Sequence, residues 1–182
     1  MPNNNRITLS QQQSSDEALV ELSKDNRWSQ LKPEETIAVP GTYAQQALHF
    51  VQSFQPESVA YHIPFDFRFD KELSPDALEK ALYALVQRHD ILRTGFEQGE
   101  NGLQQIVHGV VNLPHELVEA GQWTEQNIRA YTQQWAREPF DLTQPPLFKS
   151  KLLRLKNGWA WYLCFHHIAF DHMSIVQFAA DI

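Results

Sequence analysis

Two β-rich runs in the last third of the chain constrain its fold more than any other feature. Residues 147–156 and 159–166 are rich in aromatic and aliphatic side chains, and Asn157-Gly158 between them favours a type I′ hairpin turn. The second run, from 159 to 165, is aromatic and β-rich, which indicates a strand. Such a hairpin needs helices or a second layer to cover it.

The second run ends in two adjacent histidines, His166 and His167. Successive strand residues face opposite sides, so only one of the two imidazoles can face a given cavity. Imidazole is the side chain that exchanges protons near neutral pH, and the end of a strand is a place where a fold presents it to a substrate. A plainer interpretation is that both are core-edge histidines bonded to backbone carbonyls.

The sequence favours neither a metal site nor a thiol nucleophile. Adjacent histidines on opposite faces chelate poorly, Cys164 is the only cysteine, and no other spacing resembles a ligand set. Because Cys164 lies in mid-strand among aromatic residues, we expect it to be a buried, protonated thiol.

Earlier in the chain, helical and extended patterns alternate. Helices are predicted at 43–54, from Pro75 (with Ser74 as N-cap) with apolar spacing through His89, and at 123–137, and strands at 58–70, 92–97, 102–108 and 112–118. Helices interleaved with hairpins indicate an α/β sandwich in which a mixed sheet is covered by helices.

Composition sets further bounds. The 182 residues are 42% hydrophobic, which suits one domain with a sizeable core. The formal charge of −7, with no basic run, argues against nucleic acid or an anionic membrane as a partner. There is no apolar stretch of eighteen residues and no signal-like start, and with one cysteine we expect a cytoplasmic protein.

Four stretches together resemble a known family. HHIAFDH at 166–172 resembles the HHxxxDG motif shared by the condensation domains of nonribosomal peptide synthetases and by chloramphenicol acetyltransferase. Residues 42–50 and 60–64 are similar to the first condensation-domain motif, residues 88–96 (RHDILRTGF) to its RHExLRTxF, and residues 139–147 to its PFDLxxxPL. The resemblance covers about residues 38 to 182.

The resemblance implies a chloramphenicol acetyltransferase-like two-layer sandwich, in which helices cover a mixed, mostly antiparallel sheet. Condensation domains have two such lobes, and residues 37–182 would form the N-terminal one. The apolar residues from 175 to 182 keep helical spacing without a C-terminal cap, so we expect the last helix to be cut short.

The implied activity is formation of an amide bond between an acyl or peptidyl thioester and an aminoacyl thioester. Both substrates would be carried on phosphopantetheine arms of carrier proteins, so the lobe itself would bind no cofactor. The implied partners are the C-terminal lobe and peptidyl carrier proteins, and we expect this lobe alone to be inactive or nearly so. Heterocyclisation is not expected, because the relatives that catalyse it have an aspartate-rich motif in place of the histidine pair.

The resemblance also implies roles for single residues. His167 would be catalytic, either as a general base or as a group that positions the amine. His166 would be a buried hydrogen-bonding residue, and Arg93 a cation that stabilises the lobe. No metal ligand is implied.

Asp171 would be structural, paired with an arginine that is Arg93, Arg88 or a residue of the second lobe. His172 departs from the family, which has glycine there. The change could alter substrate preference, mark a divergent subclass or end condensation. It could also be harmless if His172 simply starts a helix and Ser174 supplies the hydrogen bonds of the turn.

The first 36 residues differ in composition from the rest. Up to Ser15 they are mainly Asn, Gln and Ser, and we expect disorder there. Residues 16–28 could form a short amphipathic helix with Ser15 as N-cap. An arm that packs back on the lobe is the favoured interpretation, and a docking element for an upstream synthetase subunit is the alternative.

Two other functions stay open. The chain could be a non-catalytic module that docks a carrier protein or a synthetase subunit. It could also be a homotrimeric, CoA-dependent acetyltransferase-like enzyme with its site between identical subunits. Mass in solution separates these hypotheses, because the second requires a stable trimer.

Overall fold

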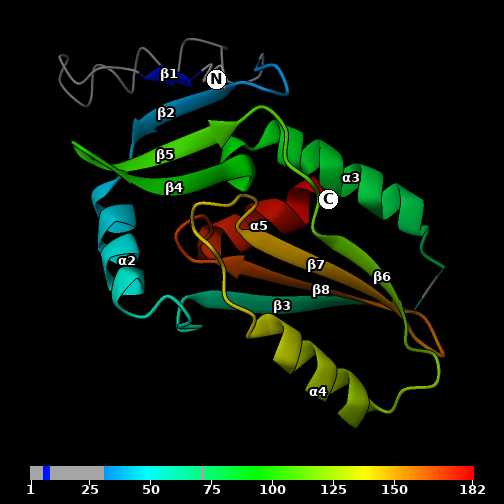
Figure 1. The fold of residues 1–182 in the computed structure, drawn as a ribbon. Helices are drawn as coiled ribbons and strands as arrows, with labels where there is room; N and C mark the ends of the chain where they lie inside the picture. The colour runs from blue at the N-terminus through cyan, green and yellow to red at the C-terminus, as the bar shows by residue number, and fades with distance from the viewer. Residues whose placement is uncertain (1–5, 9–30, 71) are drawn as a thin grey trace.

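The strands form two separate sheets in the computed structural model, which describes residues 6–8, 31–70 and 72–182 (Figure 1). The first sheet has the order β1 (Arg6–Thr8), β2 (Thr36–Pro40), β5 (Gly102–His108), β4 (Thr94–Gly99). The second has the order β3 (His62–Phe69), β8 (Trp159–His166), β7 (Phe148–Arg154), β6 (His115–Glu119). In each sheet one outer pair, β1–β2 or β6–β7, is parallel and the other pairs are antiparallel.

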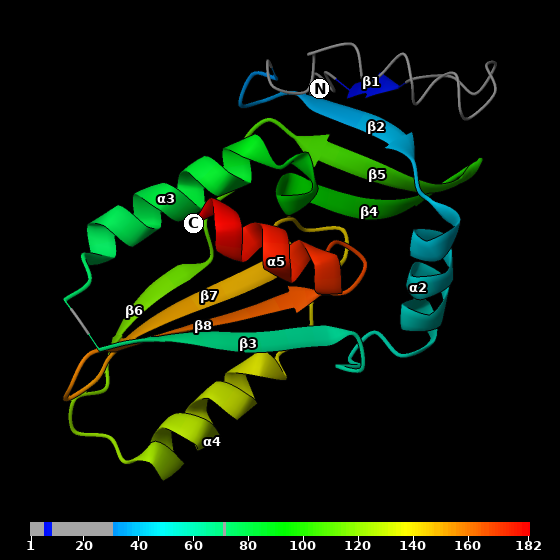
Figure 2. The same cartoon turned by 180° about the vertical axis from the view of Figure 1, so that it is seen from behind.

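Helices cover both faces of the second sheet (Figures 1 and 2). One face packs against α3 (Pro75–Arg88) and α5 (His172–Asp181), and the other against α4 (Glu125–Ala136). Trp161, Leu163 and Phe165 of β8 contribute to the larger core on the α3 and α5 side. The α/β class with mixed sheets is therefore confirmed, and its division into two sheets is a detail that the sequence did not indicate.

Local signals predicted several boundaries well. The helix α2 (Tyr43–Phe54) has the predicted bounds, and α3 begins at Pro75 after the predicted cap, with Ser74 Oγ accepting from the Ala77 amide. The strand expected at 58–70 is shorter, from His62 to Phe69. The strand expected from residue 92 starts at Thr94, because residues Asp90–Arg93 form a short 3₁₀ helix, η2.

The predicted type I′ turn at Asn157-Gly158 is wrong. Type I′ geometry requires positive φ at both central residues, and among the described residues only glycines have it. Gly158 has positive φ, at 91°, but Asn157 does not. The loop between the paired strands has four residues and is closed by a hydrogen bond from Leu155 N to Gly158 O at 3.0 Å. A Cβ on Gly158 would lie 2.2 Å from Phe69 O, so contact with β3 shapes the turn.

We expect Gly158→Ala to destabilise the protein by at least about 1–2 kcal/mol, because it combines an unfavourable φ with a clash against backbone. Urea denaturation measures the change. Gly102→Ala, at φ 109° with open space around it, measures the cost of positive φ without a clash. Gly121→Ala has neither a positive φ nor a close neighbour. Equal stability of Gly158→Ala and Gly121→Ala would contradict this account of the turn.

The N-terminal expectation is partly corrected. Residues Arg6–Thr8 pair with β2 in parallel register, so the expected disorder up to Ser15 is wrong for these three residues. Ile and Thr favour strands, and an edge strand offers unpaired backbone groups. The remaining residues up to 15, and the helix expected at 16–28, lie outside the described residues.

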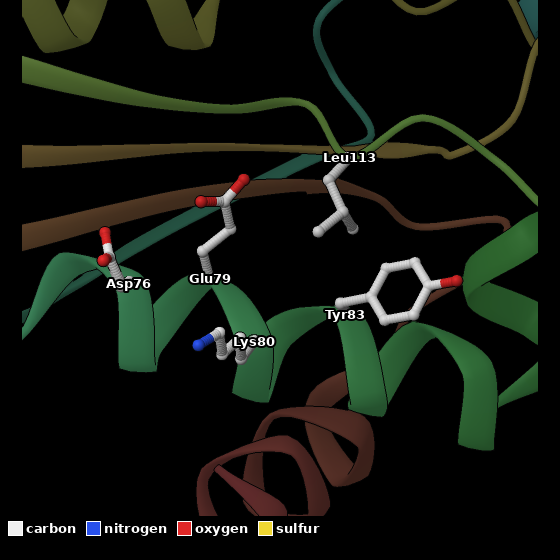
Figure 3. Close-up of a pocket in the computed structure, with 5 residues that line it drawn as sticks. All are labelled: Asp76, Glu79, Lys80, Tyr83 and Leu113. Atoms are coloured by element: carbon white, nitrogen blue, oxygen red, sulfur yellow. The ribbon is translucent and has the colours of Figure 1, made fainter.

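One hollow on the surface lies along α3 (Figure 3). Four residues of that helix and Leu113 line it, with a volume of about 420 Å³; the four are Asp76, Glu79, Lys80 and Tyr83. None of the described helices is both long enough and apolar enough to cross a membrane.

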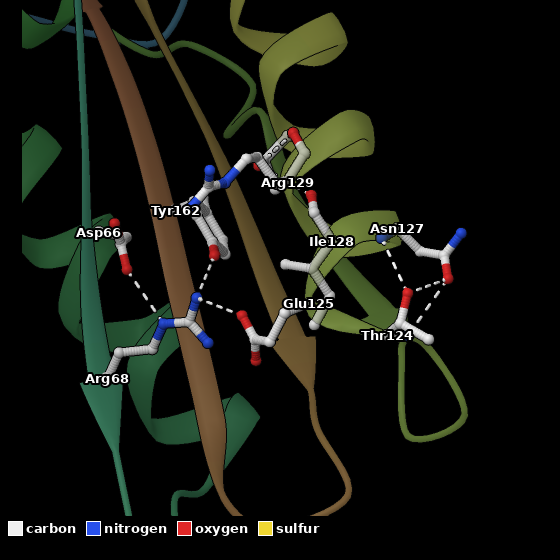
Figure 4. Close-up of polar contacts among 9 residues, drawn as sticks. Asp66, Arg68, Thr124, Glu125, Asn127, Ile128, Arg129 and Tyr162 are labelled. Carbon is white, nitrogen blue, oxygen red and sulfur yellow. Dashed lines mark hydrogen bonds and ion pairs between the residues drawn. The ribbon is translucent and has the colours of Figure 1, made fainter.

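Arg68 of β3 links the second sheet to α4 (Figure 4). It donates to the Tyr162 hydroxyl of β8 at 2.6 Å and lies 3.8 Å from the Glu125 carboxylate in the first turn of α4. Thr124 and Asn127 cap the same helix reciprocally. These contacts hold the helix that covers the even-numbered face of β8.

Candidate active site

The site begins where β8 ends at His166 and the chain turns toward α5. The turn is closed by a hydrogen bond from Ala169 N to His166 O at 3.1 Å, and the Ile168 amide donates to His166 Nδ1 at the same distance. The His166 amide itself donates to Leu147 O at 2.9 Å. Backbone and side chain of His166 therefore both hold the turn that follows it.

His166 is fully buried, and its environment keeps it neutral. Burial lowers the pKa of His166 to about 4, and neighbouring His62 and His167 act in the same direction. Because Nδ1 accepts the Ile168 amide, the ring proton is on Nε2. The chemistry of His166 is thus that of a structural hydrogen-bonding group.

His167 is the exposed member of the pair. Its amide donates to Tyr61 O at 2.8 Å, and its Nδ1 lies 2.9 Å from Phe170 O. A carbonyl only accepts hydrogen bonds, so Nδ1 carries a proton, and in the neutral ring Nε2 keeps its lone pair. The turn thus selects the tautomer in which Nε2 can accept a proton.

Asp171 caps the helix that follows. Its carboxylate accepts hydrogen bonds from Ser174 N at 2.8 Å and Ser174 Oγ at 2.7 Å, and Ser174 Oγ accepts from the Asp171 amide at 3.2 Å. These bonds, with Ser174 as the main partner, hold the pKa of Asp171 below its usual value. The carboxylate contacts neither arginine that the sequence offered: Arg88 pairs with Asp181, and Arg93 with Asp90.

We expect Asp171→Ala to cost about 1 kcal/mol of folding stability through loss of the N-cap. A carboxyl with a lowered folded-state pKa stabilises the fold above its unfolded pKa, and this contribution is lost as pH falls through the lowered value. The control is Asp171→Asn, which still caps but does not titrate. Between pH 7 and pH 3, the melting temperature should depend less on pH in Asp171→Asn than in wild type. Parallel curves of melting temperature against pH would contradict the cap assignment.

His172 is the first residue of α5, and it is exposed. Among the described residues no residue other than glycine has positive φ, so this position does not require glycine for its backbone conformation. Together with the Ser174 bonds, this is the ordinary helix start that the sequence left open as one alternative.

Arg93 contacts β5 and η2. It is 2% exposed, donates to the His108 carbonyl of β5 and pairs with Asp90. Burial raises the pKa of Asp90, although the Arg93 charge acts in the opposite direction. Arg93 thus ties η2 to the first sheet.

Cys164 is a buried thiol, as predicted. It is fully buried, and burial raises its pKa to about 11, so it is protonated at neutral pH. Its Sγ lies 3.7 Å from Ala136 O. Within the described part of the chain, no group of three His, Cys, Asp or Glu side chains could hold a metal ion.

Sequence reasoning missed several groups that build the site. The Phe170 carbonyl orients His167, and Gln45 of α2 donates to Ile168 O at 3.5 Å. Only the presence of Gln45 in the first family-like motif pointed to it. The hollow along α3 contains no residue of the HHIAFDH segment.

Solved structures place this fold among condensation domains. The starter condensation domain of the rhizomide synthetase RzmA superposes with a TM-score of 0.73 at 25% identity, over 79% of this chain and 36% of that chain. The four-domain nonribosomal peptide synthetase AB3403, with bound AMP and glycine, shares the fold at a TM-score of 0.72 and 22% identity, over 83% of this chain and 12% of that one.

Sequence comparison identifies the family. The model named Condensation domain matches residues 36–182. Bacitracin synthase 1 of Bacillus licheniformis is 34% identical over 141 residues, which are 74% of this chain and 3% of that protein. Tyrocidine synthase 2 of Brevibacillus parabrevis is 35% identical over 159 residues, 86% of this chain and 4% of that protein. The chain therefore belongs to the condensation domain family, and it spans a small part of the synthetases that it matches.

Proposed function

We propose that this chain supplies the histidine-bearing half of a site that joins an acyl or peptidyl thioester to an aminoacyl thioester. The observation that carries the proposal is His167: an exposed imidazole at a strand end, with Nδ1–H bonded to Phe170 O and the Nε2 lone pair available. Family membership supports amide formation as the reaction.

The proposed reaction needs little from the protein beyond placement and one proton acceptor. The amine of the aminoacyl thioester attacks the other thioester carbonyl, and the new C–N bond forms as the tetrahedral adduct develops. His167 Nε2 takes a proton from the amine nitrogen, and the adduct collapses with cleavage of the C–S bond. The same proton then neutralises the thiolate that leaves, so protons balance.

The other residues of the segment have supporting roles in this proposal. His166 and Ser174 hold the turn and the helix start on either side of His167, and Asp171 caps α5. His172 is compatible with activity because it occupies an ordinary first turn. Arg93 stabilises the lobe by joining η2 to β5.

The test of the function joins this chain to the second lobe of a condensation domain and measures dipeptide formation from two loaded carrier proteins. We expect product from the two-lobed protein and little or none from the 182 residues alone. Absence of product with every carrier pair, while the two-lobed protein folds and binds loaded carriers, would favour the non-catalytic docking module.

The helix α2, which contacts the turn that bears His167, has an exposed apolar face. This helix exposes Tyr43, Phe50 and Phe54 at 91%, 63% and 70%, although its Gln45 contacts the turn that bears His167. An apolar helix face in water marks an interaction site. We propose that it receives a carrier protein, since a carrier docked there would sit next to the base that its thioester must reach.

We expect Phe50→Asp to weaken carrier binding by about tenfold or more, because it places a charge in an apolar contact. Surface plasmon resonance with the loaded carrier measures the change, and Leu117→Asp on β6, which is also exposed, is the matched control. Unchanged carrier binding combined with a lost association between lobes would assign α2 to the second lobe instead.

We propose residues 37–182 as the lobe and residues 1–36 as an arm. Pairing of residues Arg6–Thr8 with β2 supports an arm that folds back on the lobe. A homotrimeric CoA-dependent acetyltransferase would be a stable trimer, so light scattering that shows a monomer would exclude it.

A further inference from the structure

Two histidines, the half-buried His62 and the fully buried His166, lie directly opposite each other where β3 and β8 meet. His62 of β3 is paired in register with His166 of β8, so both side chains are on the same face of the sheet, toward α4. Their ring centroids are 6.1 Å apart, with an interplanar angle of 72°. The Phe140 ring packs against both, at 4.9 Å from His62 and 6.0 Å from His166.

The protonation of each ring follows from its other hydrogen bond. His62 Nδ1 lies 2.7 Å from Ala136 O, a carbonyl, so His62 has its proton on Nδ1 and a lone pair on Nε2. His166 is the reverse, because Nδ1 accepts the Ile168 amide and Nε2 carries the proton. Burial lowers the pKa of both histidines, so both rings are neutral at pH 7.

The two remaining ring nitrogens are complementary. Both Nε2 atoms are buried, and neither has a hydrogen-bond partner among the described residues. One is a donor and the other an acceptor, and buried polar groups in proteins are nearly always paired.

We propose that His166 Nε2–H is hydrogen-bonded to His62 Nε2, and that His62 is thereby a positioning residue for the turn that presents His167. With the ring centroids 6.1 Å apart, either a small approach of the rings or one bound water between the two Nε2 atoms completes the link. Either link reinforces the His166 tautomer that the Ile168 amide favours, in which Nδ1 accepts that amide, one residue after His167. The effect of His62 on the His166 tautomer, called the tautomer lock below, does not depend on the proposed function. Its effect on catalysis rests on the proposed role of His167.

Nuclear magnetic resonance of the ring nitrogens in the ¹⁵N-histidine-labelled 182-residue chain tests the lock. In wild type we expect His166 as a single tautomer, protonated at Nε2, with that proton protected from solvent exchange. His62→Gln places an amide oxygen near the former Nε2 and should retain this pattern. His62→Asn, whose shorter amide reaches only the Ala136 carbonyl, and His62→Leu should give mixed tautomers or loss of the protected proton.

Two results would overturn the pairing: a wild-type His166 protonated at Nδ1, or an unchanged His166 spectrum in both His62→Asn and His62→Leu. Kinetics are measured in the two-lobed protein. There kcat should fall about tenfold in His62→Asn and His62→Leu but not in His62→Gln, with KM for the carriers unchanged. If the spectra confirm the tautomer lock but kcat is equal in all variants, the pairing of the two histidines holds and the positioning role of His62 in catalysis is refuted. A two-lobed protein with no activity would leave the spectroscopic result intact and count against the proposed function.

Discussion

Replacing His167 with alanine is expected to lower kcat for amide formation by about 10²–10⁴-fold in the two-lobed protein, the range of a general base. The ring is exposed, and among the described residues its hydrogen bond is to the Phe170 carbonyl three residues on, so folding should not depend on it. The melting temperature of the variant should therefore match wild type. Rates from two loaded carriers, measured by quenched flow, give kcat separately from carrier affinity.

Two further variants sharpen this test. His108→Ala removes a half-buried imidazole from the first sheet and should retain kcat, which controls for a general effect of losing a histidine. His167→Gln can hold a hydrogen bond but cannot take up a proton, so a near-normal rate would assign His167 to positioning. A normal rate in His167→Ala would show that the site assignment is wrong.

Truncation of Phe165 to alanine is expected to cost about 3–5 kcal/mol of folding free energy, the range for removal of a buried aromatic ring. This ring is fully buried and stacks on Phe170 at 3.8 Å and on Phe148 at 5.2 Å between ring centroids. Phe178 of α5 packs edge-on against it at 5.4 Å. Its loss would leave a cavity between the sheet and α5.

Urea denaturation of the Phe165→Ala and Phe50→Ala variants measures this effect against a matched control. Phe50 is 63% exposed on α2, so its truncation should change stability by about 0.5 kcal/mol or less. Similar losses of unfolding free energy in the two variants would show that the aromatic stack around Phe165 is not a main source of stability.

Features with local causes were predictable from sequence. The bounds of α2 and the start of α3 follow from capping residues and apolar spacing, and strand alternation predicted that His166 and His167 would face different environments. The buried thiol of Cys164 follows from its aromatic neighbours.

Features with distant causes were not predictable. Phe69 O determines the turn at Gly158, and pairing of β2 with β5 separates the strands into two sheets. Two local contacts were also missed: the Phe170 carbonyl reaches His167 because of the conformation of the turn, and Asp171 caps α5 where an arginine partner was expected. In each case a contact distant in sequence, or the conformation of a turn, decides the outcome.

The stacking of Phe170 on Phe165 has a consequence for motion at the site. The stacking holds Phe170, at the end of the turn, against Phe165 of β8. The buried hydrogen bond from the Ile168 amide to His166 holds the start of the turn. Amide hydrogens on this turn should therefore exchange with solvent only when the whole sheet opens. The exposed imidazole of His167 is therefore presented from a backbone that is held at both ends of the turn.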